Sequence, residues 1–430
     1  MWVRAGVMAL LALAFLQLAV STVRRGKGDI FGYFVIGQAV LHGESPYLDI
    51  DEAKKHWAAG NVWSPAFSLA VVPIAALALC SETLAMGVWQ AGNLLALAWM
   101  LSLVARLVLR RSLSWDPRGD GLLPCSLALL VPIGLAYEGI TGNFLYVQVN
   151  LMLFALVLQG LLWQARGRPV LGGVAIGTAA ALKLMPVLFL PYLVWRRRWR
   201  AAAWTLIAFV GVSLSPVLVS GWAGFVRDVH EWRHAMGAGW GSGMMNQSMP
   251  ATWDRYLGYG VVPFGTPPSN VLAVSGSLAV AVAVWATRLL TMGLALWTFR
   301  GPMEPDGRSA LAEWSVVFLV GAVYGPITHK AYLVVLVLPY ALLLALAADR
   351  RGPRGLRRGA AALLVVALLL SVVPSRDFVG RDVAAYFHMA GSYALSAMAV
   401  LFGLFWVRRW PTLDEASPHP GASLTRTGAP

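Results

Sequence analysis

Long apolar runs, separated by short clusters of arginine, make up most of the chain. A transmembrane helix needs about 20 consecutive apolar residues, and most of the runs approach that length. We identify twelve of them: 6–23, 85–109, 121–137, 144–163, 170–183, 187–195, 201–221, 271–299, 312–328, 331–348, 359–374 and 384–407. The pattern predicts an all-α polytopic membrane protein with about 12 transmembrane helices in one domain over residues 1–410. Residues 411–430, rich in Pro, Ser, Thr and Gly, are predicted to form a disordered cytoplasmic tail.

Some runs need a separate interpretation. Residues 6–23 have the length of a secretory signal, but many spans follow, so we interpret them as a retained helix that orients the chain. A thirteenth run, 65–80, is predicted to lie along the membrane surface. The runs 170–183 and 187–195 are too short to cross alone and read as a broken hairpin around Lys183, which requires a surrounding of protein or a water-filled cavity.

Positive charge orients these helices. If 65–80 does not cross, every arginine cluster falls on the cytoplasmic side, as the positive-inside rule demands. The clusters are 110–118, 166–168, 196–200, 300–308, 350–358 and 408–409. The outer face then receives two long loops and four short turns. These are 24–84, 222–270, 138–143, 184–186, 326–330 and 375–383. Candidate chemistry is therefore expected on the outside.

The composition agrees with a membrane protein. Hydrophobic residues make up 58% of the chain and charged residues 13%, whereas a soluble domain carries about 25% charged residues. The net charge of +14 is explained by arginine facing anionic lipid on the cytoplasmic side, so we expect no nucleic-acid partner. Two cysteines exclude a disulfide framework and a cysteine-built zinc site.

Two charged residues stand out near the predicted outer face. Asp29 follows the first helix, where a base could meet a substrate at the membrane surface; alternatively, it is a helix N-cap. Lys183 lies in an apolar segment, where a lysine costs about 2.5–3.5 kcal/mol at mid-bilayer and usually faces a cavity or a partner. Snorkelling to the interface is the alternative. The broken-helix context favours a fixed cation for an anionic head group.

Two outer segments add further polar groups. His329 and Lys330 lie in a turn between helices and offer a titratable ring beside a cation; they are otherwise interfacial residues that close a hairpin. The second long loop carries Asn246 and Gln247 and then Arg255, whose guanidinium can bind phosphate with two hydrogen bonds. A solvated loop is the alternative there.

Two short motifs in the second long loop are treated as chance matches. Residues 230–234 read His-Glu-Trp-Arg-His, a pattern that places two imidazoles on one helix face for zinc, but no convincing third ligand follows. The glycine-rich run 237–243 follows no strand, so it does not predict a dinucleotide site. It reads as a flexible loop that could order over a substrate.

The order and spacing of several motifs resemble glycosyltransferase family 87, over roughly residues 24–345. The motifs are Asp29-Ile30-Phe31, Gly43-Glu44-Ser45-Pro46-Tyr47, Trp63-Ser64-Pro65, Gly142-Asn143, Gln148-Val149-Asn150, Gly172-Gly173, Lys183-Leu184-Met185-Pro186 and Arg196-Arg197-Arg198-Trp199-Arg200. The resemblance implies the C-type glycosyltransferase fold of bacterial membrane enzymes. It also implies a polyprenyl-phosphate sugar donor, mannose above all, a lipid or glycan acceptor, inversion at the anomeric carbon, and a site on the outer face of the plasma membrane.

The resemblance also implies roles for individual residues. Asp29 corresponds to the acidic catalytic residue. Lys183, His329, Arg255 and Lys330 are implied to bind the donor phosphate. The implied substrate-binding residues are Tyr33, Asn143, Gln148, Asn150, Asn246 and Gln247. The Gly-Gln-x-Asn pattern of the family is split here, with Gly142-Asn143 displaced from Gln148-x-Asn150.

The chemistry of the reaction agrees with one acid facing several cations. A sugar joined to a lipid phosphate already carries a good leaving group, so the enzyme needs cations for the departing phosphate and one carboxylate for the acceptor proton. No cofactor or metal is required. A transporter or lipid flippase is the main alternative, but it predicts matching halves, which the chain lacks. A polymerase or ligase of envelope glycans is a second alternative.

Overall fold

The structure, a computed structural model, describes residues 2–47, 62–109, 125–237, 245–257, 278–305 and 307–410. Within those residues every regular element is a helix and no strand is present, which confirms the all-α prediction for this part of the chain. The predicted tail 411–430 and the glycine-rich residues 238–243 lie outside the described residues.

The helices differ widely in length. In chain order they are α1 (Trp2–Arg25), α2 (Ile30–Leu41), α4 (Pro65–Ala70), α5 (Val72–Cys80), α6 (Glu82–Val108), α7 (Cys125–Leu135), α8 (Tyr137–Leu145), α9 (Asn150–Ala165), α10 (Pro169–Leu182), η1 (Met185–Leu188), α11 (Phe189–Trp195), α12 (Trp199–Leu214), α13 (Val217–Gly237), α14 (Met249–Leu257), α15 (Leu278–Thr298), α16 (Arg308–Tyr324), η3 (Lys330–Leu336), α17 (Val337–Ala348), α18 (Arg354–Ala367), η4 (Leu368–Val372), α19 (Arg376–Met389) and α20 (Ser392–Arg408).

Fewer helices than predicted are long enough to cross a membrane alone. In the described part of the chain, four are: α6, α15, η3 with α17, and α18 with η4. Four bent pairs raise the number to eight if each pair is one span: α1 with α2, α7 with α8, α12 with α13, and α19 with α20, bent by 61°, 67°, 85° and 61°. The predicted twelve spans are not confirmed, because several apolar runs are bent or broken into shorter helices.

The positions of the helix breaks show which of the predicted breaks and turns are correct. The predicted break at Lys183 is confirmed, since α10 ends at Leu182 and η1 begins at Met185. The run 65–80 is divided into α4 and α5, each too short to cross a membrane. The turns predicted at 138–143 and 375–383 are wrong, because α8 and α19 cover them almost entirely. The chain bends just before the first of these segments, between α7 and α8, and is kinked within the second at Gly380, which has a φ of 78°.

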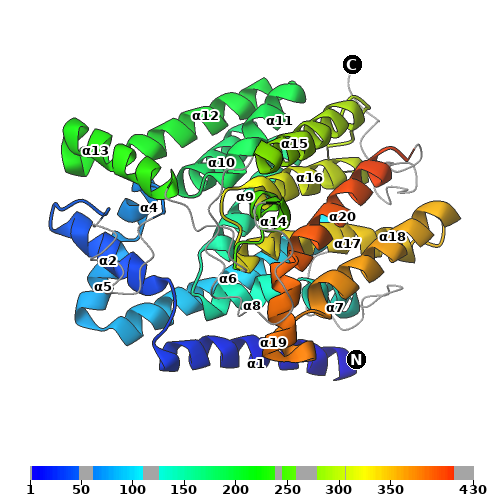
Figure 1. The fold of residues 1–430 in the computed structure, drawn as a ribbon, viewed down its shortest axis with the longest axis horizontal. Coiled ribbons are helices and arrows are strands. Elements are labelled where there is room, and N and C mark those ends of the chain that lie inside the picture. The colour runs from blue at the N-terminus through cyan, green and yellow to red at the C-terminus, as the bar shows by residue number, and fades with distance from the viewer. Residues whose placement is uncertain are drawn as a thin grey trace, which may run out of the picture.

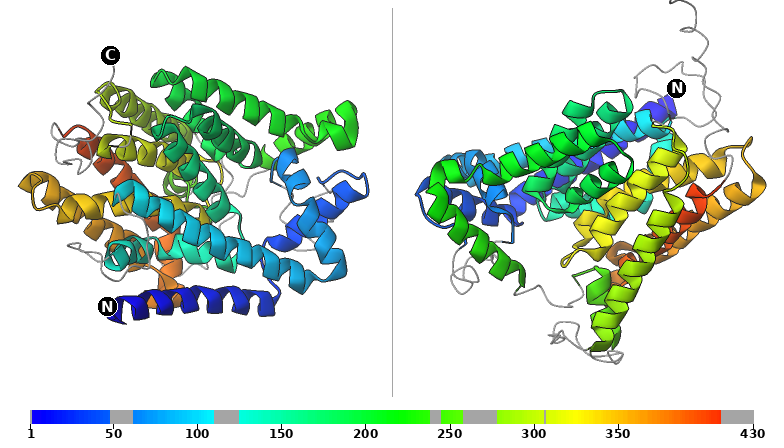
Figure 2. Two further views of the ribbon diagram at one scale, coloured as in Figure 1. Left: turned by 180° about the vertical axis from the view of Figure 1, so that it is seen from behind. Right: turned by 90° about the horizontal axis from the view of Figure 1, so that it is seen from above.

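The helices pack side by side into a bundle. In Figure 1, α1 runs along one side of the molecule and α12 along the opposite side, with α6, α8, α9 and α10 between them. Figure 2 shows α15 along an edge of the bundle. The short helices α2, α4 and α5 pack against one another beyond the end of α1 (Figure 1). The break between α8 and α9 is buried at Val147, Gln148 and Val149, and the link from α1 to α2 packs against it through Gly28.

Small residues bring α10 close to α12. A Cβ atom at Gly177 would lie 2.3 Å from the carbonyl oxygen of Thr205, and one at Gly173 would lie 2.6 Å from that of Ala201. No side chain fits at either position, so the two glycines permit the close backbone approach that small residues give to membrane helices. The same packing fixes the end of α10, where Lys183 begins the break.

A buried carboxylate joins three helices near their arginine-rich ends. Glu313 of α16 has 0% exposure. It accepts hydrogen bonds from Arg196, from Nε of Arg408 at 2.5 Å and from the hydroxyl of Tyr192 at 3.1 Å. A buried charge of this kind is tolerated because it is paired and hydrogen-bonded. The cluster therefore ties α11, α16 and α20 together at the end of the bundle that carries the arginines.

Candidate active site

Asp29 lies in the link between α1 and α2, outside both helices. It is the N-cap residue of α2 by position, as the alternative interpretation expected, but its side chain makes no cap hydrogen bond. The carboxylate instead accepts a hydrogen bond from the side-chain amide of Gln148, and the backbone NH donates to the carbonyl oxygen of Tyr146 over 2.9 Å. Burial raises the pKa of Asp29 from 3.8 to about 6, against the opposing effects of Lys183 and of Gln148. A carboxylate with this pKa is ionised at neutral pH and suited to accept a proton.

The turn that presents Gln148 to Asp29 is strained. Val147 is fully buried and has a φ of 54°, a conformation that a β-branched residue rarely adopts. Such strain costs about 1–3 kcal/mol and is maintained only by the surrounding structure. Gly28 packs against this turn with a φ of 136°, and a Cβ atom there would lie 2.6 Å from Val147 Cγ2. Only glycine therefore lets the two strained segments meet beside Asp29.

Lys183 lies in the break between α10 and η1 with an extended backbone (φ −149°, ψ 118°). Its Nζ donates to Oδ1 of Asn150 over 2.6 Å and lies 3.6 Å from the ring centroid of Tyr332. The ammonium is held by these protein contacts, so the snorkelling alternative is not supported. Burial lowers the pKa of Lys183 to about 7, and the nearby negative charge of Asp29 acts in the opposite direction. Asp29 is hydrogen-bonded to Gln148 and Lys183 to Asn150, two residues further along the same turn, so one short segment of the chain binds both the acid and the cation.

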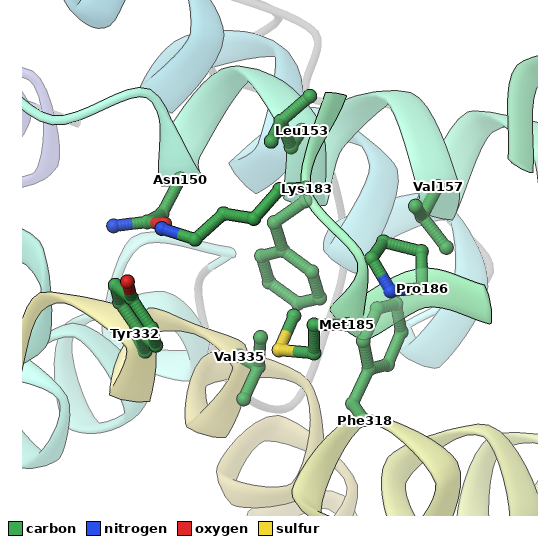
Figure 3. A pocket seen from close by; sticks show the side chains of 10 residues that line it. Asn150, Leu153, Val157, Lys183, Met185, Pro186, Phe318, Tyr332 and Val335 are labelled. Carbon is green, nitrogen blue, oxygen red and sulfur yellow. The ribbon is translucent and has the colours of Figure 1, made fainter. Parts of the chain in front are cut away.

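A mostly apolar pocket adjoins the ammonium. It is lined by Asn150, Leu153, Phe154, Val157, Lys183, Met185, Pro186, Phe318, Tyr332 and Val335. Figure 3 shows the side chains of Lys183 and Asn150 pointing toward each other on one side of the pocket. Met185, Phe318 and Val335 supply apolar walls on the other side. The ammonium of Lys183 thus borders apolar walls.

His329 and Lys330 connect α16 to the following helix η3. The ring of His329 lies 4.5 Å from that of Tyr146, edge to face. Burial, together with the charges of Lys330 and Lys183, lowers the pKa of His329 to about 3, so the imidazole is neutral at pH 7. Lys330 Nζ pairs with Glu138 Oε2 of α8 at 2.5 Å. The segment therefore supplies a neutral ring and a balanced ion pair, and the positive charge that acts on Asp29 comes from Lys183.

Two further predicted residues lie around the same centre. Tyr33 packs its ring against those of Trp63 and Phe67, with centroids 5.0 and 5.1 Å away. Its buried hydroxyl makes no hydrogen bond within the described residues and lies close enough to Asp29 to feel its charge. Asn143 is fully buried and donates to the carbonyl oxygen of Ala331 over 2.9 Å. Asn143 thus holds η3 against α8, and it contributes to the site by positioning these two helices.

The predicted residues of the second long loop support the segment before His329. Asn246 Oδ1 accepts from the backbone NH of Thr328 over 3.0 Å, and the backbone NH of Gln247 donates to the Thr328 carbonyl oxygen over 2.7 Å. Arg255 is 3% exposed, and its Nη1 donates to the carbonyl oxygen of Asn246 over 2.8 Å. These contacts link α14 to the turn that carries His329. Phosphate binding by Arg255 stays a prediction.

Three groups at the site were not identified from the sequence: the carboxylate of Glu138, the ring of Tyr332 and the strained turn at Val147. A lone acid inside an apolar stretch was a usable signal for Glu138, since such a charge normally has a partner. Tyr332 and Val147 carry no comparable signal. Their importance comes from contacts with residues distant in the sequence.

The zinc-like motif takes a different role. In the part of the chain that the structure describes, no group of three or more His, Cys, Asp or Glu side chains could hold a metal ion. Glu231 of the motif accepts a hydrogen bond from the hydroxyl of Ser45 over 2.6 Å, and Asp228, one helical turn earlier, accepts from the same hydroxyl over 3.2 Å. Both carboxylates tie α13 to the segment that follows α2.

Comparison with known proteins identifies the family. The model of glycosyltransferase family 87 matches residues 61–323, which is more than half of the chain. The chain belongs to glycosyltransferase family 87. The matched segment of this family member contains Lys183, Asn150, Gln148 and Arg255, whereas Asp29 and His329 lie outside it.

Two curated relatives of this family 87 member come from Mycobacterium tuberculosis. A polyprenol-phosphate-mannose-dependent alpha-(1-2)-phosphatidylinositol mannoside mannosyltransferase of strain ATCC 25618 / H37Rv is 28% identical over 164 residues, 38% of this chain and 36% of the relative. A polyprenol-phosphate-mannose-dependent alpha-(1-2)-phosphatidylinositol pentamannoside mannosyltransferase of strain CDC 1551 / Oshkosh is 28% identical over 289 residues, 65% of this chain and 59% of the relative. The chain thus spans about a third and three fifths of the two relatives. No solved structure matches it significantly.

Proposed function

We propose that this protein is a membrane glycosyltransferase that moves one sugar, mannose above all, from a polyprenyl-phosphate donor to a lipid or glycan acceptor. The observation that carries the proposal is that Gln148 binds the carboxylate of Asp29 while Asn150, two residues later, binds the ammonium of Lys183, which brings the acid and the cation to one turn. The family supports a transferase over the alternative transporter or flippase. The names of both mycobacterial relatives specify a polyprenol-phosphate-mannose donor, which supports the choice of sugar and carrier.

The geometry supports an inverting displacement. The acceptor hydroxyl oxygen attacks the anomeric carbon while the bond from that carbon to the phosphate oxygen breaks. Asp29 takes the hydroxyl proton, as its raised pKa of about 6 allows. The departing polyprenyl phosphate gains negative charge, and the ammonium of Lys183 stabilises it in the transition state. The acceptor oxygen bonds to the anomeric carbon on the face opposite the departing phosphate, so the configuration at that carbon inverts.

Neighbouring groups hold this pair ready for reaction. Gln148 donates to Asp29 and fixes the orientation of the carboxylate, while Asn150 fixes the ammonium of Lys183. The neutral imidazole of His329 can donate one hydrogen bond without adding charge, and its Nδ1 has no hydrogen-bond partner within the described residues. We assign His329 to a donor phosphate oxygen or a sugar hydroxyl. Tyr33, with its unpaired hydroxyl, is assigned to the sugar.

The direction of the helices supports a site on the outer face. α9 begins beside the site and runs to Arg166, and α10 returns from Arg168 to Lys183. α16 begins at Arg308 and ends just before the turn of His329, and η3 with α17 runs from Lys330 toward the arginines at 350–351. The site thus lies at the ends of these helices that lack arginine. By the positive-inside rule those ends face away from the cytoplasm.

A donor panel tests the proposal. The purified protein in lipid nanodiscs receives polyprenyl-phosphate mannose, glucose or arabinose, each with a phosphatidylinositol-based and a glycan acceptor. We expect transfer from the mannose donor, with a product of inverted anomeric configuration by NMR. Failure to transfer any of these sugars, with the protein folded, would refute the function, and retention of configuration would refute the displacement step alone.

A further inference from the structure

An arginine lies near the middle of α15, a helix long and apolar enough to cross a membrane. Only 17% of the apolar window of α15 is buried inside the protein. The neighbours of Arg288 on this helix are largely exposed: Trp285 by 60%, Leu289 by 55% and Leu290 by 54%. Figure 2 shows α15 at the edge of the bundle. Arg288 therefore belongs to a helix that presents most of its surface to lipid.

The contacts of Arg288 fix its place but use little of its hydrogen-bonding capacity. Its Nη2 donates to the carbonyl oxygen of Tyr324 over 3.2 Å, and its Cζ lies 5.4 Å from the ring centroid of Trp285. The hydroxyl of Tyr324 is in turn held by Thr291 Oγ1 at 2.7 Å and by the carbonyl oxygen of Thr287 at 3.1 Å. A guanidinium carries five N–H donors, and one of them accounts for the hydrogen bond found here.

Among the residues that the structure describes, Arg288 has no carboxylate partner. Residues 258–277, which precede α15 in the sequence, include no Asp or Glu. A charged side chain inside a membrane segment is costly and usually marks a ligand or ion pathway. An anion from the membrane can therefore bind the remaining N–H groups of Arg288, and lipid phosphate is the anion that a membrane supplies.

The position of Arg288 relates it to the candidate active site. Tyr324, which Arg288 contacts, is the last residue of α16, and the chain continues from there through 325–328 to His329. The helix α14, which supports that segment through Asn246, also packs against α15 and α16. Arg288 thus lies on the lipid-facing flank of the structure that holds His329, at the same depth as the end of α16.

We propose that Arg288 binds the phosphate of the lipid-linked sugar donor on the lipid-facing flank between α15 and α16, before that phosphate reaches Lys183. The inference rests on the proposed function and extends it to the route of the donor. A phosphodiester presents two free oxygens in the geometry that a guanidinium fork recognises. The exposed Trp285 and Leu289 would lie against the apolar carrier chain.

Binding of polyprenyl monophosphate, a ligand without sugar, tests this directly. Wild-type protein and the variants Arg288→Gln and Arg288→Lys are placed in nanodiscs of phosphatidylcholine, and the bound lipid is quantified by native mass spectrometry. We expect Arg288→Gln to weaken binding about tenfold, as loss of a charge-assisted hydrogen bond predicts, and Arg288→Lys to retain part of it. Arg106→Gln, which removes an exposed arginine from α6, should leave binding unchanged.

Steady-state kinetics separate a ligand role from a structural one. For Arg288→Gln we expect an apparent KM for the donor raised about tenfold with kcat nearly unchanged, because the residue acts before the chemical step. Equal binding of polyprenyl phosphate by wild type and Arg288→Gln would overturn the proposal. The proposal would also be overturned if Arg288 were needed for the binding of phosphatidylglycerol but not for the binding of polyprenyl phosphate. Arg288-dependent lipid binding without any sugar transfer would refute the proposed function and leave this inference standing.

Discussion

Replacing Lys183 with methionine keeps the bulk of the side chain and removes its charge. In the wild type, the carboxylate of Asp29 and the ammonium of Lys183 are both required. We therefore expect kcat/KM to fall below pH about 6, where Asp29 becomes protonated, and above pH about 7, where Lys183 loses its proton. Because Lys183 lowers the pKa of Asp29, removing the ammonium must raise that pKa further. The variant should thus lose most of its activity at acidic pH.

The size of both effects follows from the site. Two unit charges within a few ångströms of each other interact by about 3 kcal/mol at an effective dielectric constant of about 20. Each pKa unit corresponds to about 1.4 kcal/mol. In the plot of kcat/KM against pH, the acidic limb, where Asp29 titrates, should therefore move upward by about one to two pH units. Loss of a cation that stabilises the developing charge on the leaving phosphate costs about 3–4 kcal/mol, or a factor of about 10² to 10³ in kcat.

The assay measures sugar transfer from the polyprenyl-phosphate donor between pH 5 and 9, in nanodiscs of fixed composition. Lys27→Met is the matched control, because it removes an exposed lysine close to Asp29 in the sequence; its pH profile should match that of the wild type. An acid limb that stays near pH 6 in Lys183→Met would refute the electrostatic pairing of the two residues. Unchanged kcat would remove Lys183 from the reacting centre.

Further variants test individual contacts. Glu138→Gln breaks the ion pair with Lys330 and should destabilise the fold by about 2–3 kcal/mol in thermal unfolding; an unchanged midpoint would contradict this. Gly28→Ala places a methyl group against Val147 and should displace the link that carries Asp29. We therefore expect kcat to fall at least about tenfold while donor binding persists; a wild-type kcat would show that the link tolerates the methyl group. Glu313→Gln leaves two buried arginines without their carboxylate and should cost about 3–5 kcal/mol of stability with KM unaltered; a raised KM at normal stability would contradict a purely structural role.

Part of the fold and of the site could be predicted from residue types alone. The break at Lys183 follows from a charged residue and a proline in an apolar run, a combination that an uninterrupted membrane helix does not accommodate. Asp29 stands out for a similar reason, as an acid directly after a long helix. These signals are local, because the cost of placing a charge or a helix-breaking residue does not depend on the rest of the fold.

Other features depend on contacts between distant segments. Whether Lys330 acts as a free cation depends on Glu138 in α8, and the state of His329 depends on its burial and on two neighbouring lysines. The number of spans was overestimated because hydrophobicity does not show where a run bends, as between α12 and α13. Arg288 lay inside an apolar run whose neighbours were unknown, so its missing counter-ion could be recognised only in the structure.

The most direct test concerns the carboxylate itself. Asp29→Asn keeps the shape of the side chain and abolishes its capacity to take a proton, whereas Asp228→Asn makes the same change at a buried carboxylate on α13. In a single-turnover assay with prebound polyprenyl-phosphate sugar, Asp29→Asn should slow transfer by a factor of about 10² to 10⁴ with donor binding preserved. Asp228→Asn should transfer at nearly the wild-type rate. Transfer by Asp29→Asn within a few-fold of wild type would show that another group is the base.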